Sequence, residues 1–407
     1  MVLRYEEAAA AVRTHAAGVR PRGVEEVPLL ESAGRVLAEA VAADRDYPPF
    51  ARSTRDGFAC RAGELSREAV RVKGQLRAGE AWDGGAIGAG EAVEIMTGAA
   101  VPEGADCVVM VEHVREGGGQ IVLTEGQAIA AGENIVPIGA EARAGDVAIA
   151  AGTRIGISSI GAAAASGAAE VTVFERPRVA ILATGDELVE VAQDPLPYQI
   201  RNSNSSSLAA QVAAAGGEAV LFPIVRDDAG KTRDAIRSAA ECDLLLLTGG
   251  VSMGKFDFVE EALRAEGAEF FFTGVRIQPG KPVVFGKLPA QYFFGLPGNP
   301  ISTMVTFALF AAPLLRALGG ESDRRPKFFL ARLEEEVRVK PGLTRFLPAR
   351  AESDFRGARV RRVTWQGSGD LAAAARANAF LVVPETAERL EAGEIVSLLE
   401  IQAVSTA

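Results

Sequence analysis

The chain has 407 residues, of which 48% are hydrophobic, and a formal net charge of -10. This length is too great for one core and predicts two to four domains. The negative charge argues against a nucleic-acid partner, which would require a basic face. No run approaches the roughly 18 to 20 apolar residues that span a bilayer, and the first residues lack a signal-peptide pattern. We therefore expect a cytoplasmic protein with no membrane partner.

The use of cysteine and histidine narrows the chemistry further. Cys60, Cys107 and Cys242 are odd in number, far apart and never in a CxxC pair, so neither a disulfide framework nor a thiolate zinc site is indicated. The chain has only two histidines. Carboxylates, lysines and hydroxyls are therefore the candidate chemical groups.

The first part of the chain predicts a β-rich module inserted into another domain. Residues 5–17 have helical composition, and a short helix or turn is expected at 32–40. Asp56-Gly57 lies between short apolar runs, which is typical of a tight hairpin. The remaining expected elements are strands at 70–72, 92–96, 107–111, 120–124 and 147–150 and an alanine-rich helix at 157–166. We assign 46–138 to the β-rich module, and 1–45 together with 139–175 to the domain around it.

Residues 176–322 alternate strand and helix patterns, which predicts a doubly wound α/β domain. Its central strand is the run of four leucines after Asp243, apolar on both faces. Helices are expected at 205–215, 229–240, 256–265 and 301–318, and strands from 177 and at 219–224, 243–247, 270–277, 283–286 and 292–295. Residues 319–326 are typical of a linker. Alternating polar and apolar residues at 328–339, 359–364, 380–383 and 394–401 predict a small β barrel or sandwich within 327–407.

Three loops of the α/β domain mix small residues with hydroxyls or acids, at 182–187, 247–252 and 295–302. In a parallel sheet, such loops lie side by side. Gly249 and Gly250 let the backbone approach a ligand closely, and neighbouring hydroxyls and free N–H groups favour a phosphate or another oxyanion. The alternative is a tight strand-to-helix turn with no ligand.

The third loop and a nearby turn add donors for an anion. Pro300 is placed to open a helix, so Asn299 is expected to cap it, and the N–H groups behind Ser302 would face the anion. Lys281, in the rigid turn 278–282, would hold an oxyanion and stabilise charge during its transfer. The alternative for Lys281 is a solvated turn lysine.

Acids are concentrated at the same turns, namely Asp186, Glu187, Asp227, Asp228 and Asp257. Carboxylates in an anion pocket bind a divalent cation, accept hydrogen bonds from amino groups of the ligand, or transfer protons. The alternative for Asp227 and Asp228 is helix capping before Ala229.

Taken together and in order, several stretches resemble the molybdopterin molybdotransferases, the family of bacterial MoeA and the gephyrin E domain. The resemblance covers essentially the whole chain. The matching stretches are 53–59, 95–106, 132–135, 184–188, 203–204, 248–257, 279–282 and 295–300.

This resemblance implies an elongated four-domain subunit that forms a homodimer. The active cleft would lie between the α/β domain of one subunit and the inserted β-rich domain of the other. The family inserts molybdate into adenylylated molybdopterin and releases AMP, with a divalent cation, usually Mg²⁺. Transient contacts with the adenylyltransferase and with recipient molybdoenzymes are also implied. The thiolate ligands of molybdenum would come from the pterin, so a cysteine cluster is not needed.

The resemblance also assigns site residues by motif. The expected catalytic residues are Asp56, Thr97, Glu141, Glu187, Asp228, Asp257 and Lys281, with Asp228 and Asp257 also binding Mg²⁺. The expected cofactor-binding residues are Thr184, Gly185, Ser203, Asn204, Thr248, Gly249, Gly250, Ser252, Pro297, Gly298, Asn299, Ser302 and Ser368. Of these, Ser302 and Ser368 join Lys281 where the family has residues near the oxyanion.

The chain departs from the family pattern at four positions. Arg55 stands in place of a methionine, Glu141 in place of an aspartate, Gln278 in place of a lysine, and Pro348 where an arginine is expected. Arg345 or Arg350 would then substitute for that arginine. Because of these changes, two alternative functions remain. The chain is a paralogue that prefers tungstate, or it is a catalytically reduced scaffold that holds the cofactor. An adenylyltransferase acting one step earlier fits less well, because it would not need the domains on either side of the α/β unit.

Overall fold

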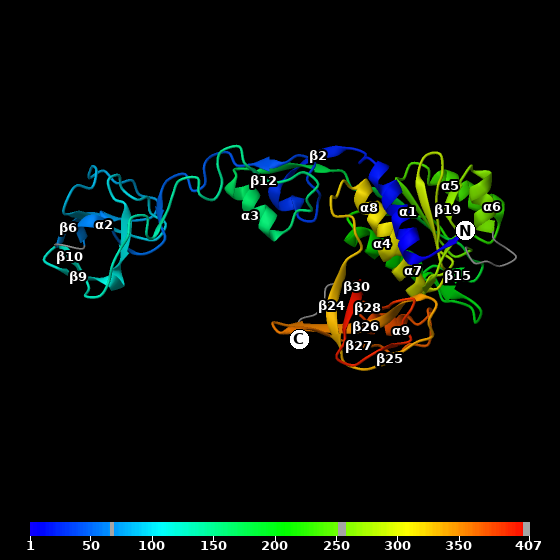
Figure 1. Cartoon of the computed structure of the whole chain (residues 1–407). Helices are drawn as coiled ribbons and strands as arrows, with labels where there is room; N and C mark the ends of the chain where they lie inside the picture. Colours follow the sequence, from blue (N-terminus) through cyan, green and yellow to red (C-terminus); the bar gives the residue numbers. More distant parts are fainter. Residues whose placement is uncertain (66–68, 251–257, 402–407) are drawn as a thin grey trace.

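The computed structural model describes residues 1–65, 69–250 and 258–401. It is an elongated molecule with a β-rich body at one end, an α/β body and a second β body at the other, and an arm between them (Figure 1). The arm contains β2 (Val24–Pro28), β12 (Val147–Ile149) and α3 (Ile157–Ala165). This confirms the predicted fold class, including the inserted β-rich domain, the elongated linking domain and the C-terminal barrel.

The α/β body is organised around a six-stranded sheet of order β17-β14-β18-β23-β22-β19. The first four strands are parallel to one another, and β22 is antiparallel to both of its neighbours, β23 and β19. The bounds are β14 Arg178–Ala183, β17 Glu218–Leu221, β18 Leu244–Thr248, β19 Glu269–Phe272, β22 Val284–Lys287 and β23 Tyr292–Leu296. The predicted run of leucines is therefore a strand inside the sheet, and all five residues of β18 are buried.

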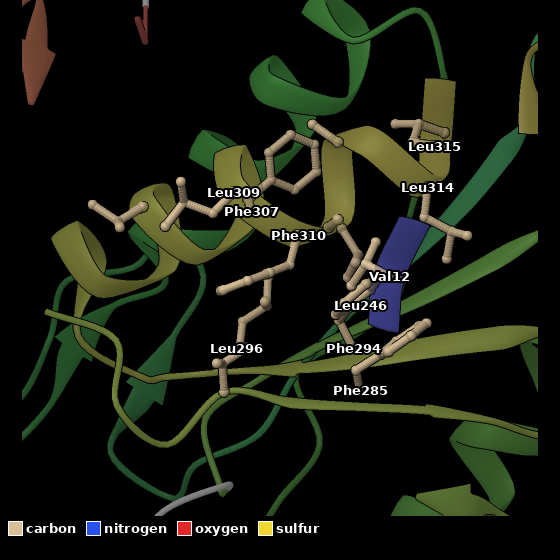
Figure 2. Packing of buried hydrophobic residues seen from close by; sticks show 14 of the residues in the cluster. Val12, Leu246, Phe285, Phe294, Leu296, Phe307, Leu309, Phe310, Leu314 and Leu315 are labelled. Carbon is tan, nitrogen blue, oxygen red and sulfur yellow. The ribbon is translucent and has the colours of Figure 1, made fainter. Parts of the chain in front are cut away.

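Helices cover both faces of this sheet because successive side chains of a strand point to opposite sides. Leu244 and Leu246 pack with α1, α4 and the helix that begins at Pro300, as Figure 2 shows for Leu246. Leu245 and Leu247 pack with α5 and α6 on the other face. The bounds are α1 Tyr5–Gly18, α4 Ser203–Ala214, α5 Ala229–Ser238 and α6 Phe258–Ala265.

The N-terminal helix α1 belongs to this core. Ala8, Val12 and Ala16 recur every four residues and are buried in the cluster that contains Leu246. The preceding strand β1 (Val2–Leu3) pairs with β20 (Gly274–Val275) of the α/β body. The start of the chain, which the sequence groups with the linking domain, therefore packs on the α/β sheet.

Within the described residues, one helix is long and apolar enough to cross a membrane by composition, Pro300–Leu318, although 78% of its apolar window is buried inside the protein. It is therefore a core helix, at the position where the sequence predicts a helix of the α/β domain. It consists of α7 (Pro300–Thr306), a π-helical turn (Phe307–Ala311) and α8 (Ala312–Leu318). Pro313 lacks an N–H and crowds the preceding turn, which accounts for the change of hydrogen-bond pattern.

The β-rich body is a six-stranded sheet of order β8-β5-β7-β6-β10-β9. The strands expected near 70, 92, 107 and 120 are all present. The bounds are β5 Gly57–Cys60, β6 Val70–Leu76, β7 Glu91–Ile95, β8 Cys107–Met110, β9 Val114–Gly117 and β10 Gln120–Leu123.

The prediction of a hairpin at Asp56-Gly57 is wrong. The strand before it, β4 (Arg52–Ser53), pairs with β11 (Ile135–Val136), whereas β5 pairs with β7 and β8. Glycine is needed for another reason, because a Cβ at Gly57 would lie 1.9 Å from the carbonyl oxygen of Val109. Close strand approach, and not turn formation, therefore fixes this residue.

The arm consists of two antiparallel strand pairs and α3. β2 pairs with β13 (Glu170–Phe174), and β3 (Val41–Ala42) pairs with β12. In place of the helix or turn expected at 32–40 there is a 3-10 turn, Leu29–Ser32, followed by isolated bridges. The segment expected as a linker, 319–326, is held against this arm, since its backbone donates a hydrogen bond to Gly152.

The C-terminal body is a closed five-stranded barrel. Pairing runs through β26, β27, β24, β30 and β28 and returns to β26. The bounds are β24 Phe328–Leu333, β26 Thr344–Asp354, β27 Gly357–Arg362, β28 Ala379–Val383 and β30 Ile395–Glu400. β21 (Ile277–Gln278) adds to β26 and so joins the barrel to the α/β body.

Candidate active site

A cavity of about 410 Å³ lies where β14, β18 and β23 end. All three strands are parallel, so their carboxyl ends share one edge of the sheet. The residues expected at the site that line this cavity are Thr184, Glu187, Ser203, Asn204, Thr248, Gly249, Gly298 and Asn299. The three loops identified in the sequence therefore do converge on one hollow.

Asn204, in the first turn of α4, connects the loops. Its Nδ2 donates to the Thr248 hydroxyl at 2.9 Å and to the Gly298 carbonyl at 2.8 Å. The Asn204 Oδ1 and the Thr184 hydroxyl are buried and have no hydrogen-bond partner among the described residues. Buried polar atoms are normally paired, so these two atoms are candidates for ligand contacts.

Glycine is required in the loop after β18. Gly249 and Gly250 have positive φ angles of 91° and 62°, a region that side chains disfavour. A Cβ at Gly249 would lie 2.3 Å from the Thr184 carbonyl oxygen, and one at Gly250 would lie 2.6 Å from Val259. The loop thus packs directly on its neighbour beside the cavity, which any substitution would disturb.

The third loop differs from expectation in one detail. Asn299 occupies the N-cap position of α7 and Pro300 the first turn, but the Asn299 side chain makes no capping bond. Its Nδ2 instead donates to the Ser368 hydroxyl at 2.9 Å. The backbone N–H of Ile301 also donates to the Ser368 carbonyl, at 2.9 Å. These bonds tie the C-terminal body to the cavity, so the capping expectation for Asn299 is wrong.

The cavity also contains residues that sequence reasoning missed. They are Leu188, Ile200, Arg201, Asn202, Pro300, Gly369 and Leu371. Ile200 and Arg201 arrive there because their short strand pairs with β15 (Leu188–Val189), a two-residue pairing with no periodic signal. Asn202 did carry a signal, since it caps α4 by accepting a bond from Ser205 N.

Several expected residues lie outside the cavity walls. Lys281 is exposed on the turn before β22, and Ser302 is buried in α7. The turn does lie against α7, since a Cβ at Gly280 would be 3.6 Å from the Ser302 carbonyl oxygen. Gly185, Gly250, Pro297 and Ser368 adjoin the lining loops without lining the cavity. Ser252 and Asp257 lie outside the described residues.

Asp228 has a structural role that the sequence left open. It is the N-cap of α5, and its Oδ1 accepts from Lys231 N at 2.8 Å. The nearby Asp186 accepts from Asp227 N at 3.4 Å. Among the described residues, no group of three or more His, Cys, Asp or Glu side chains could hold a metal ion.

Asp56 and Thr97 form a polar pair in the β-rich body. The Thr97 backbone N–H donates to Asp56 Oδ1 at 2.6 Å and its hydroxyl donates to the same oxygen at 2.8 Å. Both bonds lower the pKa of Asp56 below its ordinary value, and the bond from the backbone N–H has the larger effect. Glu141 is paired with Arg52 at 2.6 Å. The sheet that carries Asp56 lies at the opposite end of the molecule from the α/β body (Figure 1).

Three family descriptions match successive parts of the chain. They are "MoeA N-terminal region (domain I and II)" at residues 3–167, "Probable molybdopterin binding domain" at 180–317 and "MoeA C-terminal region (domain IV)" at 330–401. The pocket at the sheet edge thus belongs to the molybdopterin-binding unit. Fold and pocket together define a multidomain transferase of molybdenum cofactor biosynthesis.

Similarity to individual proteins extends along the whole chain. The chain is 34% identical over 380 residues to the molybdopterin molybdenumtransferase of Staphylococcus aureus (strain COL), covering 92% of this chain and 90% of that protein. A crystal structure of the molybdopterin biosynthesis MoeA protein from Pyrococcus horikosii is 31% identical, covers 99% of this chain and 100% of that one, and has a TM-score of 0.74. A second, from Pyrococcus horikoshii OT3, is 28% identical over 98% and 100%, with a TM-score of 0.78. The chain belongs to the MoeA family, as the resemblance predicts.

Proposed function

We propose that this chain inserts molybdate into adenylylated molybdopterin and releases AMP. The observation that carries the proposal is the convergence of the loops after β14, β18 and β23 on one cavity of about 410 Å³, large enough for a drug-sized organic ligand. The cavity combines glycine-rich backbone with hydroxyls and amides, which suits a phosphate together with a polar ring. Family membership supplies the reaction class.

In this proposal the cavity residues bind and orient the pterin substrate. Asn204 is held by Thr248 and Gly298, so it presents its amide without needing to reorganise. Thr184 offers a hydroxyl that the described protein leaves unpaired. Lys281, on the turn beside α7, would approach the molybdate oxygens and stabilise the charge that develops as the metal is transferred.

The β-rich body would act on the cavity of a second subunit. Asp56 and Thr97 flank β5 and β7 of the β-rich body, and Glu141 pairs with Arg52 of β4 just before it. The β-rich body lies at the opposite end of the molecule from the α/β body (Figure 1), so these residues would reach a cavity only across a homodimer. There, the lowered pKa of Asp56 makes it a weak base, so it would act as an anionic hydrogen-bond acceptor that orients a ligand N–H. Contacts with an adenylyltransferase or a recipient molybdoenzyme would be transient.

Magnesium fits this chain only in part. The described residues hold no set of acids that would bind a cation alone, and Asp228 already accepts a backbone bond. Mg²⁺ is commonly bound by one or two carboxylates together with substrate phosphates, and Asp228 with Asp257 would supply these. When bound, the ion would neutralise phosphate charge. The proposal assigns no step to it.

The proposal is tested by measuring nucleotide release. The purified protein with adenylylated molybdopterin is incubated with molybdate, with tungstate or with no oxyanion. We expect AMP release to depend on molybdate. Release with tungstate alone would identify the tungstate-preferring paralogue, and tight pterin binding without release would identify the scaffold; either result overturns the proposal.

A hydroxyl deletion separates ligand binding from stability. Thr184→Val removes a hydroxyl without a described partner, so we expect unchanged thermal stability and about tenfold weaker pterin binding. Thr306→Val is the matched control, because that hydroxyl donates to the Ser302 carbonyl inside the helix and should affect stability only. Unchanged binding in Thr184→Val would remove Thr184 from the site.

A further inference from the structure

The arm is attached to the α/β body through an ion pair between a partly buried arginine and a buried glutamate. Arg154 lies in the arm between β12 and α3, and its Nη2 is 2.7 Å from Oε2 of Glu321, which follows α8. Arg154 Nε also donates to Glu321 Oε1 at 3.2 Å. The pair is therefore bidentate, the geometry in which arginine and carboxylate bind with most directional specificity.

The same guanidinium reaches two further segments. Arg154 Nη1 donates to the Gly34 carbonyl at 2.9 Å, and Nη2 donates to the Ala215 carbonyl at 2.8 Å. Gly34 lies in the first pass of the chain through the arm, and Ala215 is the C-cap of α4 in the α/β body. One side chain therefore links both passes of the arm to two helix ends of the α/β body.

Burial makes this link hard to replace. Glu321 is only 7% exposed, so removing Arg154 would leave a carboxylate in the interior with its main partner gone. Arg316 is the second cation near Glu321, at 3.9 Å, too far for a normal hydrogen bond. Burial also lowers the pKa of the Arg316 guanidinium. Arg154 is thus the principal partner of Glu321.

Three glycines show how closely the two surfaces fit. Gly152, Gly216 and Gly320 all have positive φ angles. A Cβ on Gly152 would lie 2.2 Å from the Ser322 hydroxyl, and one on Gly216 would lie 2.7 Å from Arg154 Nη2. A Cβ on Gly320 would lie 2.2 Å from the ring of Phe174 at the end of β13. The arm and the α/β body are therefore in close contact here, and we call this contact the arm seat.

We propose that Arg154 is a positioning residue of the transferase, which sets the direction of the arm and thereby the place of the β-rich body. The β-rich body lies at the far end of the arm from the seat (Figure 1), so a small rotation at the seat moves Asp56 by a much larger distance. The effect on catalysis rests on the proposed function, in which Asp56 of one subunit acts at the cavity of the other subunit.

The direct test measures the direction of the arm. Spin labels are attached to cysteines introduced at Glu116 in the β-rich body and Glu261 in α6, both exposed. The native cysteines are buried and should label slowly. Labelled full-length chains are diluted into unlabelled protein, so that the distance measured is the one within a chain. We expect Arg154→Ala to broaden the distance distribution at least twofold.

A matched control excludes a general effect of losing an ion pair. Arg233→Ala breaks the pair with Glu266 at 3.0 Å, which lies wholly within the α/β body, and should leave the distribution unchanged. Arg154→Lys keeps the charge without the planar fork and should broaden it less than alanine. A double variant, Arg154→Met with Glu321→Gln, removes both charges of the pair and is used if Arg154→Ala fails to fold. An unchanged distribution in Arg154→Ala, or in the double variant, would overturn the arm seat.

The functional part is tested on the same variants. We expect Arg154→Ala to reduce kcat for AMP release at least tenfold while pterin binding to the cavity changes less than twofold, with partial rescue in Arg154→Lys. A general loss of folding would weaken binding as well. A broadened distance distribution with normal kcat would refute the positioning role of Arg154 in catalysis. It would also count against a role of the β-rich body in the reaction, although the structural role of the arm seat would be confirmed.

Discussion

At the scale of single residues, the Asp56–Thr97 pair has a measurable electrostatic signature. Two hydrogen bonds to Asp56 Oδ1 favour the charged form, so the pKa of Asp56 is lowered. These bonds stabilise the folded chain above the pKa that Asp56 has when unfolded, and the contribution is lost as pH falls through the lower folded pKa. The pair therefore contributes to the stability of the folded chain throughout the neutral range.

Removing one of the two donors should raise the pKa of Asp56 only part of the way. Thr97→Val deletes the hydroxyl bond and keeps the backbone N–H, which is the larger cause. Carboxyl ¹³C NMR titration of Asp-labelled protein should show the pKa of Asp56 moving upward yet remaining below its ordinary value. Thr124→Val, in the same body, should not move it. No change in Thr97→Val would show that the hydroxyl bond is absent in solution.

Gly57 provides a second residue-scale prediction. With a carbonyl oxygen 1.9 Å from the position of a Cβ, Gly57→Ala forces β5 and β8 apart and should destabilise the β-rich body by about 1–3 kcal/mol. Gly117→Ala is the control, because nothing lies within 4 Å of its Cβ position. Urea midpoints of the two variants give the comparison. Equal midpoints would contradict the close approach.

At the scale of elements, the α/β core depends on β18. Leu246 is fully buried beside Phe294 (Figure 2), so Leu246→Ala should cost about 3 kcal/mol through lost contacts and a cavity. Leu221→Ala is the control in β17 of the same sheet, since Leu221 is 56% exposed and should change stability by less than about 0.5 kcal/mol. Urea denaturation gives both values, and similar losses would show that the core does not depend on β18.

The strength of local patterns explains which elements the sequence could predict. β18 was predictable because its leucines are apolar on both faces. β26 was missed because Pro348 stands inside it and proline is normally excluded from a paired strand. The strand tolerates it, since Pro348 lies opposite Phe380 in the pairing and its carbonyl still accepts a bond from Val363 N at 2.8 Å.

Prediction of the candidate site from the sequence was also limited to residues that local patterns could place. The loops after β14, β18 and β23 could be placed together because parallel strands end at one edge. Arg201 and Gly369 could not, because each reaches the cavity through tertiary contacts that leave no periodic pattern in the sequence. The failed hairpin at Asp56-Gly57 has a related cause, since the pairing partners of its two strands lie about 35 to 85 residues away in the chain.

At the scale of the whole molecule, the separation between the β-rich body and the cavity determines how active sites can be assembled. The arm holds the β-rich body, which carries Asp56, away from the α/β body of its own chain (Figure 1). If both contribute to one reaction, each site needs residues from two subunits. A defect in the β-rich body and a defect in the cavity would then be separable by mixing chains.

Two inactive variants should therefore restore activity together. Asp56→Asn damages only the β-rich body, and Asn204→Ala damages only the cavity. When they are co-expressed with two different affinity tags, random pairing in a homodimer leaves about one quarter of all sites intact, and purification through both tags in turn should raise this to about half. Molybdate-dependent AMP release is the measurement. The control combines two differently tagged copies of Asp56→Asn, in which every β-rich body is altered and no site is intact. Activity no higher than this control would mean that each chain uses its own β-rich body or none, and the shared cleft would have to be abandoned.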